Sequence, residues 1–211
     1  MEHQLSLPEK LYLLSINPQK GGLVNSEGLS LDYSIIAAYI MELERAGNIE
    51  IVDSRIRVKS FNSGCVVNAF ILKKFKKFDN PLKISRWFNR LYYSLNHIKR
   101  GLKAGLVEKR VIRLEGHRFL FFGWQKPFLL EKTMAREMSL KVGNMVYEGQ
   151  AAGDWKMFLS LIEPAGLLKR IFGDRQKRRN ARQRLKQMNV DNEITVALKK
   201  AIAGARAAAV S

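Results

Sequence analysis

The sequence is poor in the residues that build disulfides and metal sites. It has one cysteine, Cys65, and three histidines among 211 residues. A single cysteine cannot form an intramolecular disulfide, and nothing indicates an oxidising compartment. Zinc sites need several cysteine or histidine ligands at suitable spacing, so we expect no metal site and no other cofactor.

Long apolar runs and enzyme motifs are also missing. No uninterrupted apolar stretch approaches the length that crosses a bilayer, and the first ten residues contain no apolar signal-peptide core. We therefore expect a cytoplasmic protein whose membrane contact, if it has one, is peripheral. The patterns G-x-S-x-G and H-E-x-x-H and the Walker phosphate loop are absent, so we expect no enzymatic activity.

Acidic residues are scarce relative to basic ones. The chain has 19 Asp and Glu against 37 Lys and Arg, which gives a formal net charge of +18. Such an excess predicts a polyanionic partner, and phosphate provides the counter-charge either on nucleic acid or on lipid headgroups. Solubility is the alternative explanation, although a smaller net charge would suffice for it.

Helical signals dominate the chain. Ser6 and Glu9 form a capping-box pattern with a proline in the first turn, Asp32 can cap a second helix, and Gly105 follows the clearest apolar stripe. Caps and apolar spacing predict helices over residues 7–16, 32–46, 65–75, 81–104, 129–147, 154–162, 165–188 and 192–208.

Two β-hairpins are predicted, one from alternating runs over residues 49–58 and one between Gly105 and Pro127. The chain has no linker rich in Pro, Gly or Ser, and its apolar fraction of 46% is that of an ordinary globular protein. We therefore expect a mainly α fold, a single-domain helical bundle over residues 1–211 with surrounding amphipathic helices and two β-hairpins.

The second hairpin places large apolar side chains close to basic ones. The apolar residues are Phe119, Leu120, Phe121, Phe122 and Trp124, and the preceding helix ends in the basic stretch Lys99–Lys103. A protein that sits on an anionic membrane needs both, because charge attracts it and apolar groups hold it there. The alternative is a strand buried on both faces, which has the same pattern.

A second basic region is the tract from Lys169 to Lys186, in which Asp174 is the only acid. Its cations fall on every side of the expected helix, so the tract is either a solvated helix or a phosphate-binding surface. A helix followed by a hairpin is also the outline of a winged-helix DNA reader. Nucleic acid is therefore the alternative partner, although so apolar a hairpin suits contact with DNA phosphate poorly.

Four pieces of the sequence resemble the Golgi phosphoprotein 3 family in order and spacing. They are LSLPEKLYLLSI, AYIMELERAGNIEI, LNHIKRGLKAGLVEKRVI and FLFFGWQKPF, and the block around GLVEK is the most specific. The resemblance covers about residues 5–147 and is weaker beyond 153. It implies a mainly helical domain that binds phosphatidylinositol 4-phosphate, inserts an apolar hairpin and, in eukaryotes, retains membrane enzymes by their cytosolic tails at the Golgi.

Carried onto this chain, the resemblance places the headgroup site before the GLVEK block. Two family arginines fall on Asn96 and Lys99, while a family tryptophan and a third arginine fall near Glu27 and on Ile36. Lysine cannot hold phosphate in the planar, two-bond manner of arginine. These departures suit a distant or prokaryotic-type member.

The sequence therefore predicts a peripheral membrane-binding protein whose partner is anionic lipid. The expected headgroup residues are Asn96, Lys99, Arg100 and Lys103. The expected inserting residues are Phe119, Leu120, Phe121, Phe122 and Trp124. Whether the chain forms a homo-oligomer is left open.

Overall fold

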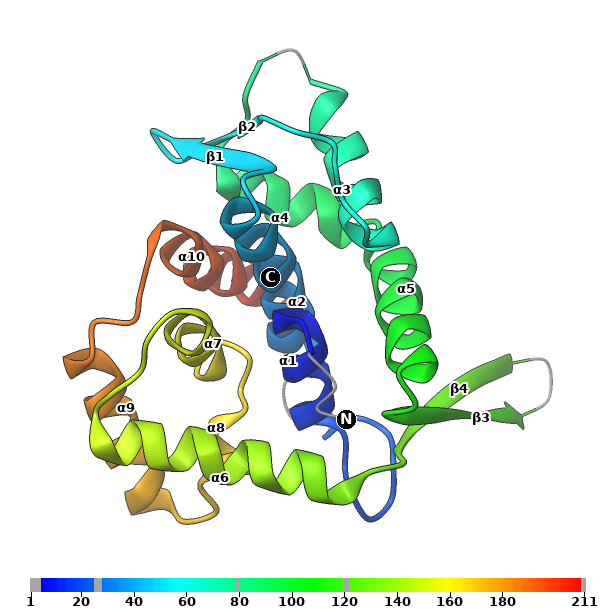
Figure 1. Cartoon of the computed structure of the whole chain (residues 1–211), viewed down its shortest axis with the longest axis vertical. Coiled ribbons are helices and arrows are strands. Elements are labelled where there is room, and N and C mark those ends of the chain that lie inside the picture. Colours follow the sequence, from blue (N-terminus) through cyan, green and yellow to red (C-terminus); the bar gives the residue numbers. More distant parts are fainter. Residues whose placement is uncertain (1–4, 25–27, 79, 120–121, 210–211) are drawn as a thin grey trace.

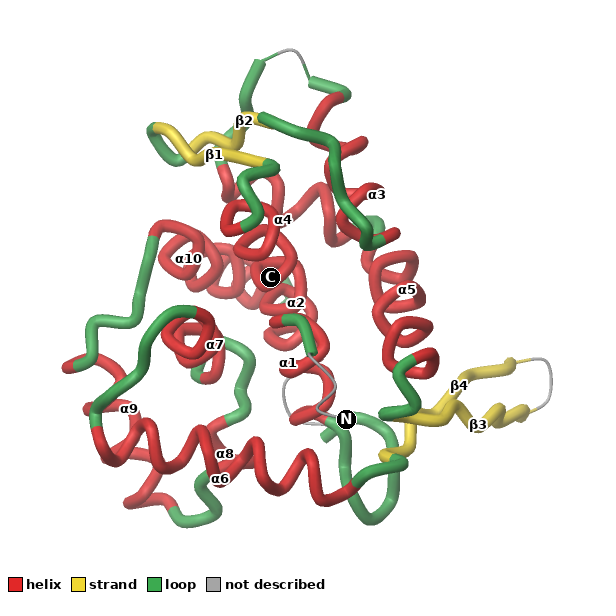
Figure 2. The backbone as a smooth tube through the Cα atoms, in the orientation of Figure 1, coloured by secondary structure: helices red, strands yellow, loops and turns green. Residues whose placement is uncertain are grey.

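The structure is a computed structural model that describes residues 5–24, 28–78, 80–119 and 122–209 (Figures 1 and 2). These residues form ten helices and two antiparallel hairpins, so the fold is mainly α, as predicted. The helices are α1 (Leu7–Ser15), α2 (Gly28–Arg45), α3 (Val66–Lys76), α4 (Ile84–Tyr92), α5 (Leu95–Glu108), α6 (Lys132–Glu148), α7 (Asp154–Ile162), α8 (Leu168–Ile171), α9 (Arg175–Gln187) and α10 (Glu193–Ala208). The hairpins pair β1 (Ile49–Val52) with β2 (Arg55–Val58), and β3 (Ile112–Phe119) with β4 (Phe122–Leu129).

Helix α2 is the centre of the bundle. It packs against α1, α4, α7 and α10, and Figure 1 shows it surrounded by the other helices. Every residue from Tyr33 to Leu43 is buried, as expected of a helix that is apolar on all sides. The rest of the fold is arranged around this helix.

The start of α1 is fixed by the predicted capping box. The Ser6 hydroxyl accepts from the Glu9 amide, and the Glu9 carboxylate accepts from the Ser6 amide at 2.8 Å. The same carboxylate accepts from Lys109 Nζ at 2.6 Å, which ties the end of α5 to the start of α1. Glu9 and Lys109 belong to two of the four sequence pieces that carry the family resemblance, and this ion pair joins those pieces in space.

Two predicted helix starts are wrong. Helix α2 begins at Gly28, so Asp32 lies inside the helix instead of capping it, and its carboxylate bonds to Lys99. Helix α4 begins at Ile84 with Lys83 as its N-cap, because Lys83 forms a β-bridge with Arg55 and is held in extended backbone. Asp79, part of the predicted start, lies outside the described residues.

The predicted helix over residues 81–104 is two helices, α4 and α5, separated at Tyr93 and Ser94. The apolar stripe nevertheless holds, since Ile84, Phe88, Leu91, Leu95, Ile98 and Leu102 are all buried. Helix α5 also continues past Gly105 to Glu108. Its glycine at 101 serves close packing, because a Cβ there would lie 2.4 Å from Cγ2 of Val67 on α3.

The predicted helix over residues 165–188 is likewise divided, into α8 and α9. Gly173 and Asp174 separate them, and the Asp174 carboxylate caps α9 by accepting from the amide of Lys177. This hydrogen bond lowers the pKa of Asp174.

The hairpin β3–β4 projects from the helical body (Figure 1). Its register runs from Ile112 opposite Leu129 at the base to Phe119 opposite Phe122. The base pair is buried in the core. Among the described residues, neither strand pairs with any other strand, so the arm is a two-stranded ribbon anchored at one end.

A basic pocket at the base of the second hairpin

A pocket with a volume of about 750 Å³ lies beside the base of the β3–β4 hairpin. Four lysines from three separate segments line it. Lys20 comes from the loop after α1, Lys99 and Lys103 come from α5, and Lys126 comes from β4. The fold thus gathers positive charge from distant parts of the chain into one concave site.

The loop after α1 is held against the hairpin by its own hydrogen bonds. Asn17 Oδ1 accepts from the Lys20 amide at 3.0 Å, which closes a tight turn. The Gly22 amide then donates to the Pro127 carbonyl of β4 at 2.7 Å. Figure 1 shows this loop next to the base of β3–β4.

Gly21 makes the close contact between loop and hairpin possible. Its φ is +64°, a conformation that side chains other than hydrogen disfavour. A Cβ on Gly21 would also lie 2.5 Å from the ring of Phe128. The position therefore admits glycine alone without rearrangement of the pocket wall.

Lys99 and Lys103 are four residues apart on α5 and so lie on one face of the helix. Lys99 Nζ donates to Asp32 Oδ1 at 2.8 Å, and the Asp32 side chain is only 13% exposed. Burial raises the pKa of Asp32, and the hydrogen bond from Lys99 opposes that rise. The charge of Lys99 is therefore offset inside the protein before any ligand binds.

For the remaining lysines of the pocket, the described residues provide no such acidic partner. Within the described ranges, no carboxylate forms an ion pair with Lys20, Lys103 or Lys126. Burial lowers the pKa of Lys103, and repulsion from Lys99 and Arg100 lowers it further. An anion in the pocket would relieve that repulsion and restore solvation lost on burial.

The predicted headgroup residues fall into two groups. Lys99 and Lys103 line the pocket, whereas Asn96 and Arg100 are exposed on α5 and are not among its lining residues. Ile36, which matches a family arginine, is fully buried in the core and cannot reach a ligand. Glu27 lies outside the described residues.

Sequence reasoning missed Lys20 and Lys126. The Gly21–Gly22 pair is typical of a turn, and the chain does turn there, but nothing in the local sequence pattern places that turn against β4. The contact joins residues more than a hundred positions apart. Only a long-range pairing signal would have identified these two lysines.

The predicted inserting residues lie at the far end of the hairpin. Phe119 and Phe122 form its last described pair, and Trp124 is opposite His117. Their side chains, and Leu120 and Phe121 altogether, lie outside the described residues. The ribbon that carries them stands clear of the helices (Figure 1). Their insertion into lipid stays a prediction.

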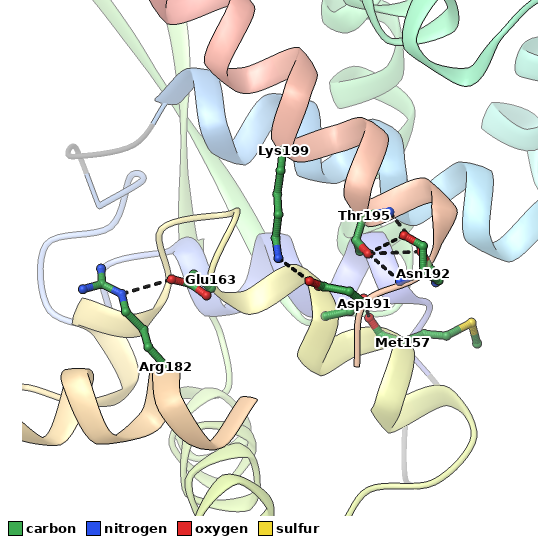
Figure 3. A network of polar contacts seen from close by, with 8 residues as sticks. Met157, Glu163, Arg182, Asp191, Asn192, Thr195 and Lys199 are labelled. Atoms are coloured by element: carbon green, nitrogen blue, oxygen red, sulfur yellow. Dashed lines mark hydrogen bonds and ion pairs between the residues drawn. The ribbon is translucent and has the colours of Figure 1, made fainter. Parts of the chain in front are cut away.

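Cations of the Lys169–Lys186 tract take part in internal contacts. Arg182 pairs with Glu163 at 3.1 Å, Arg184 donates to the Tyr147 carbonyl at 2.7 Å, and Arg178 donates to the Gly173 carbonyl at 2.6 Å. Figure 3 shows the Arg182–Glu163 pair near a second pair, Lys199 with Asp191. Part of this tract therefore holds α9 against its neighbours.

The described residues contain neither a membrane-spanning helix nor a candidate metal cluster. None of their helices combines the length and apolar character needed to cross a bilayer. No cluster of three or more His, Cys, Asp or Glu suited to a metal ion occurs among the described residues.

Comparison with known proteins agrees with the family resemblance. No curated protein matches the chain. The family model described as Golgi phosphoprotein 3 (GPP34) matches residues 7–205, and this range includes the segment beyond 153 where the resemblance is weaker. The chain therefore belongs to the Golgi phosphoprotein 3 family, and membership supports, at the level of the family, a lipid-binding and non-enzymatic role of the phosphatidylinositol 4-phosphate type.

Proposed function

We propose that the chain binds an anionic membrane surface, with a headgroup phosphate in the basic pocket and the tip of the β3–β4 hairpin in the lipid. The observation that carries the proposal is the meeting of Lys20, Lys103 and Lys126 beside the base of a projecting arm. Each cation near an anionic bilayer contributes about 1 kcal/mol. Three such lysines that face the same membrane surface would give a useful affinity, and insertion of the apolar tip would raise that affinity.

The headgroup that fits best is one with more than one negative charge. Lysine ammonium groups act as point charges and impose little geometry on phosphate, so the pocket recognises charge density more than shape. Phosphatidylinositol 4-phosphate, with its additional phosphate monoester, is the natural ligand on this view. Membrane association would then be peripheral, at the cytosolic face of the Golgi if the source has one, and cytosolic tails of membrane enzymes would be the protein partners.

Cosedimentation with liposomes tests the two elements separately. The protein is mixed with phosphatidylcholine vesicles that contain either phosphatidylinositol 4-phosphate or phosphatidylserine at matched charge. We expect preferential binding to the first, and weaker binding as salt rises because the attraction is screened. Equal binding to both kinds of vesicle would rule out preferential recognition of the phosphoinositide but would still support binding to anionic membranes.

Variants then assign the roles. Lys103→Gln/Lys126→Gln should lower affinity, and Phe121→Ser/Phe122→Ser should abolish sedimentation while the circular dichroism spectrum stays that of the wild type. The control is Lys73→Gln/Lys76→Gln, which removes the same charge from exposed positions on α3 outside the pocket. A folded serine variant that sediments like the wild type would refute insertion, and one that unfolds would show that the ring positions are core.

The alternative partner, nucleic acid, is tested by mobility shift with duplex DNA at near-physiological salt. Tight and sequence-dependent binding would replace the membrane proposal. Weak binding that disappears with salt would reflect only the net charge.

A further inference from the structure

A second pocket, of about 620 Å³, lies between the C-terminal end of α3 and helix α4. Its lining includes Lys74 from α3, Lys77 at the C-cap of that helix, and Arg86 and Arg90 from α4. It shares no lining residue with the pocket at the base of the β3–β4 hairpin. The two are therefore separate sites on the molecule.

The charge that the described residues give this second pocket is positive. Among them, no acid lines the pocket and none of its four cations is in an ion pair. Cations are stabilised near the C-terminus of a helix, the negative end of its dipole, and this effect accounts for Lys74 and Lys77. The same effect accounts for Arg90 in the last turn of α4, but not for Arg86, which lies in the first turn of that helix.

The pocket near the C-terminal helices offers a useful contrast. It is also lined by several cations, but two of them, Arg182 and Lys199, are paired with Glu163 and Asp191 (Figure 3). Internal carboxylates thus offset part of its charge. In the pocket between α3 and α4, the described residues provide no such carboxylate.

Trp87 supplies an independent observation. It lines the second pocket and is only 2% exposed, with its ring packed edge-on against Phe75 and Phe78. Its Nε1 is buried and has no hydrogen-bond acceptor in the described part of the chain. A buried indole N–H normally finds a partner, and none of the described residues supplies an acceptor for this one.

Arg90 is already held in place. Its guanidinium lies over the ring of Phe78, 4.1 Å from the centroid, a cation–π contact that limits the rotamers of the side chain. An arginine ordered in advance loses less freedom when it binds phosphate.

We propose that the pocket between α3 and α4 is a second anion site, which binds a phosphate monoester or diphosphate group. The four cations and the indole N–H are all donors, and such a set matches a ligand that offers only acceptor oxygens and negative charge. The volume leaves room for a small organic group attached to the phosphate. The phosphate can belong to a soluble compound or to a lipid headgroup, and the chemistry of recognition is the same for both.

The test follows the indole N–H signal of Trp87 by ¹⁵N–¹H NMR of the full chain. The signals of the three tryptophans are assigned with single Trp→Phe variants. Inorganic pyrophosphate is the soluble probe. We expect a saturable shift of the Trp87 signal that exceeds the shifts of the other two indoles.

A matched pair of variants on one helix provides the control. Lys74→Gln/Lys77→Gln removes two lining cations, whereas Lys73→Gln/Lys76→Gln removes the same charge from exposed positions of α3 that do not line the pocket. We expect the first pair to weaken pyrophosphate binding at least about tenfold and the second less than about twofold. Equal effects of both pairs would overturn the proposal, since net charge alone would then explain binding.

The source of the phosphate is resolved with vesicles of phosphatidylcholine, with and without phosphatidic acid. A headgroup source predicts that Lys74→Gln/Lys77→Gln lowers cosedimentation with the phosphatidic acid vesicles, and a soluble source predicts no change; either result supports the site if the Trp87 signal responds. The absence of a saturable response of the Trp87 signal would refute the site. A response to duplex DNA but not to pyrophosphate would also refute it and would identify a nucleic-acid surface instead. Failure of the hairpin variants to change membrane binding would leave this site untouched.

Discussion

Asp32→Asn should increase the affinity for vesicles that contain phosphatidylinositol 4-phosphate. In the wild type, Asp32 accepts from Lys99 Nζ at 2.8 Å and offsets its charge inside the basic pocket. Asparagine keeps an oxygen that can accept the same hydrogen bond but carries no charge. The full charge of Lys99 would then act on the ligand.

The size of the effect follows from the location of the pair. The side chains of Lys99 and Asp32 are 24% and 13% exposed, so solvent screens them only partly. A near-surface cation adds about 1 kcal/mol to binding of an anionic bilayer, which corresponds to about fivefold in Kd. Burial raises the pKa of Asp32 despite Lys99, so the folded protein holds this carboxylate ionised at a net cost. We therefore expect the free energy of unfolding to change by less than about 1 kcal/mol.

Liposome cosedimentation at near-physiological salt measures the affinity, and thermal melting measures the stability. The control is Glu50→Gln, which removes one acid from an exposed ion pair with Lys59 on the first hairpin. If the net charge of the protein alone determined binding, both variants would gain the same affinity for the vesicles. A folded Asp32→Asn protein whose affinity is unchanged or lower would show that Lys99 does not face the headgroup.

Three further outcomes are expected. Gly21→Ala should destabilise the protein by about 1–2 kcal/mol through its positive φ and the clash with Phe128, and should weaken vesicle binding, whereas Gly116→Ala on β3 has open space around the new methyl and should do neither. Glu42→Ala should cost about 1–3 kcal/mol in thermal or denaturant unfolding, because it leaves the buried first amide of α1 without its acceptor; Glu42→Gln keeps an acceptor and should cost less, and equal losses would contradict this assignment. The folded-state pKa of Asp32 is raised, so protonation of this carboxyl favours the folded state. The free energy of unfolding of the wild type relative to Asp32→Asn should therefore increase as the pH falls from neutral towards the ordinary aspartate pKa of about 3.9. A difference that stays constant with pH would show that the pKa of Asp32 is not perturbed.

Local signals predicted the elements well where a local interaction determines them. The capping box at Ser6 and Glu9, the helix predicted over residues 65–75, and the paired strands of both hairpins depend on neighbours in sequence. The break at Tyr93 and Ser94 was not predictable, because the two helices keep the apolar stripe in phase across it. A continuous stripe therefore cannot distinguish one helix from two.

The candidate site was predictable only in part. Of the predicted headgroup residues that line the pocket, Lys99 matches a family arginine, and Lys103 was predicted from the basic stretch one turn further along the same helix. Lys20 and Lys126 could not be predicted, since their proximity depends on a loop that meets β4 through the Gly22 amide. The burial of Ile36 follows from the central place of α2, which the resemblance alone does not convey.

Strand β4 fixes the distance between the basic pocket and the tip of the arm that is proposed to insert into lipid. Gln125 lines the pocket and stands three residues from Phe122 on the same strand, which is about 10 Å at the rise of an antiparallel strand. Apolar groups of interfacial proteins settle about 5–10 Å into the boundary between headgroups and acyl chains. An arm seated at that depth would hold the mouth of the pocket at the height of the outermost polar atoms of the leaflet. The pocket would then reach lipid headgroups whose terminal charge extends into water. It would not reach headgroups whose charge lies at the level of the glycerol backbone.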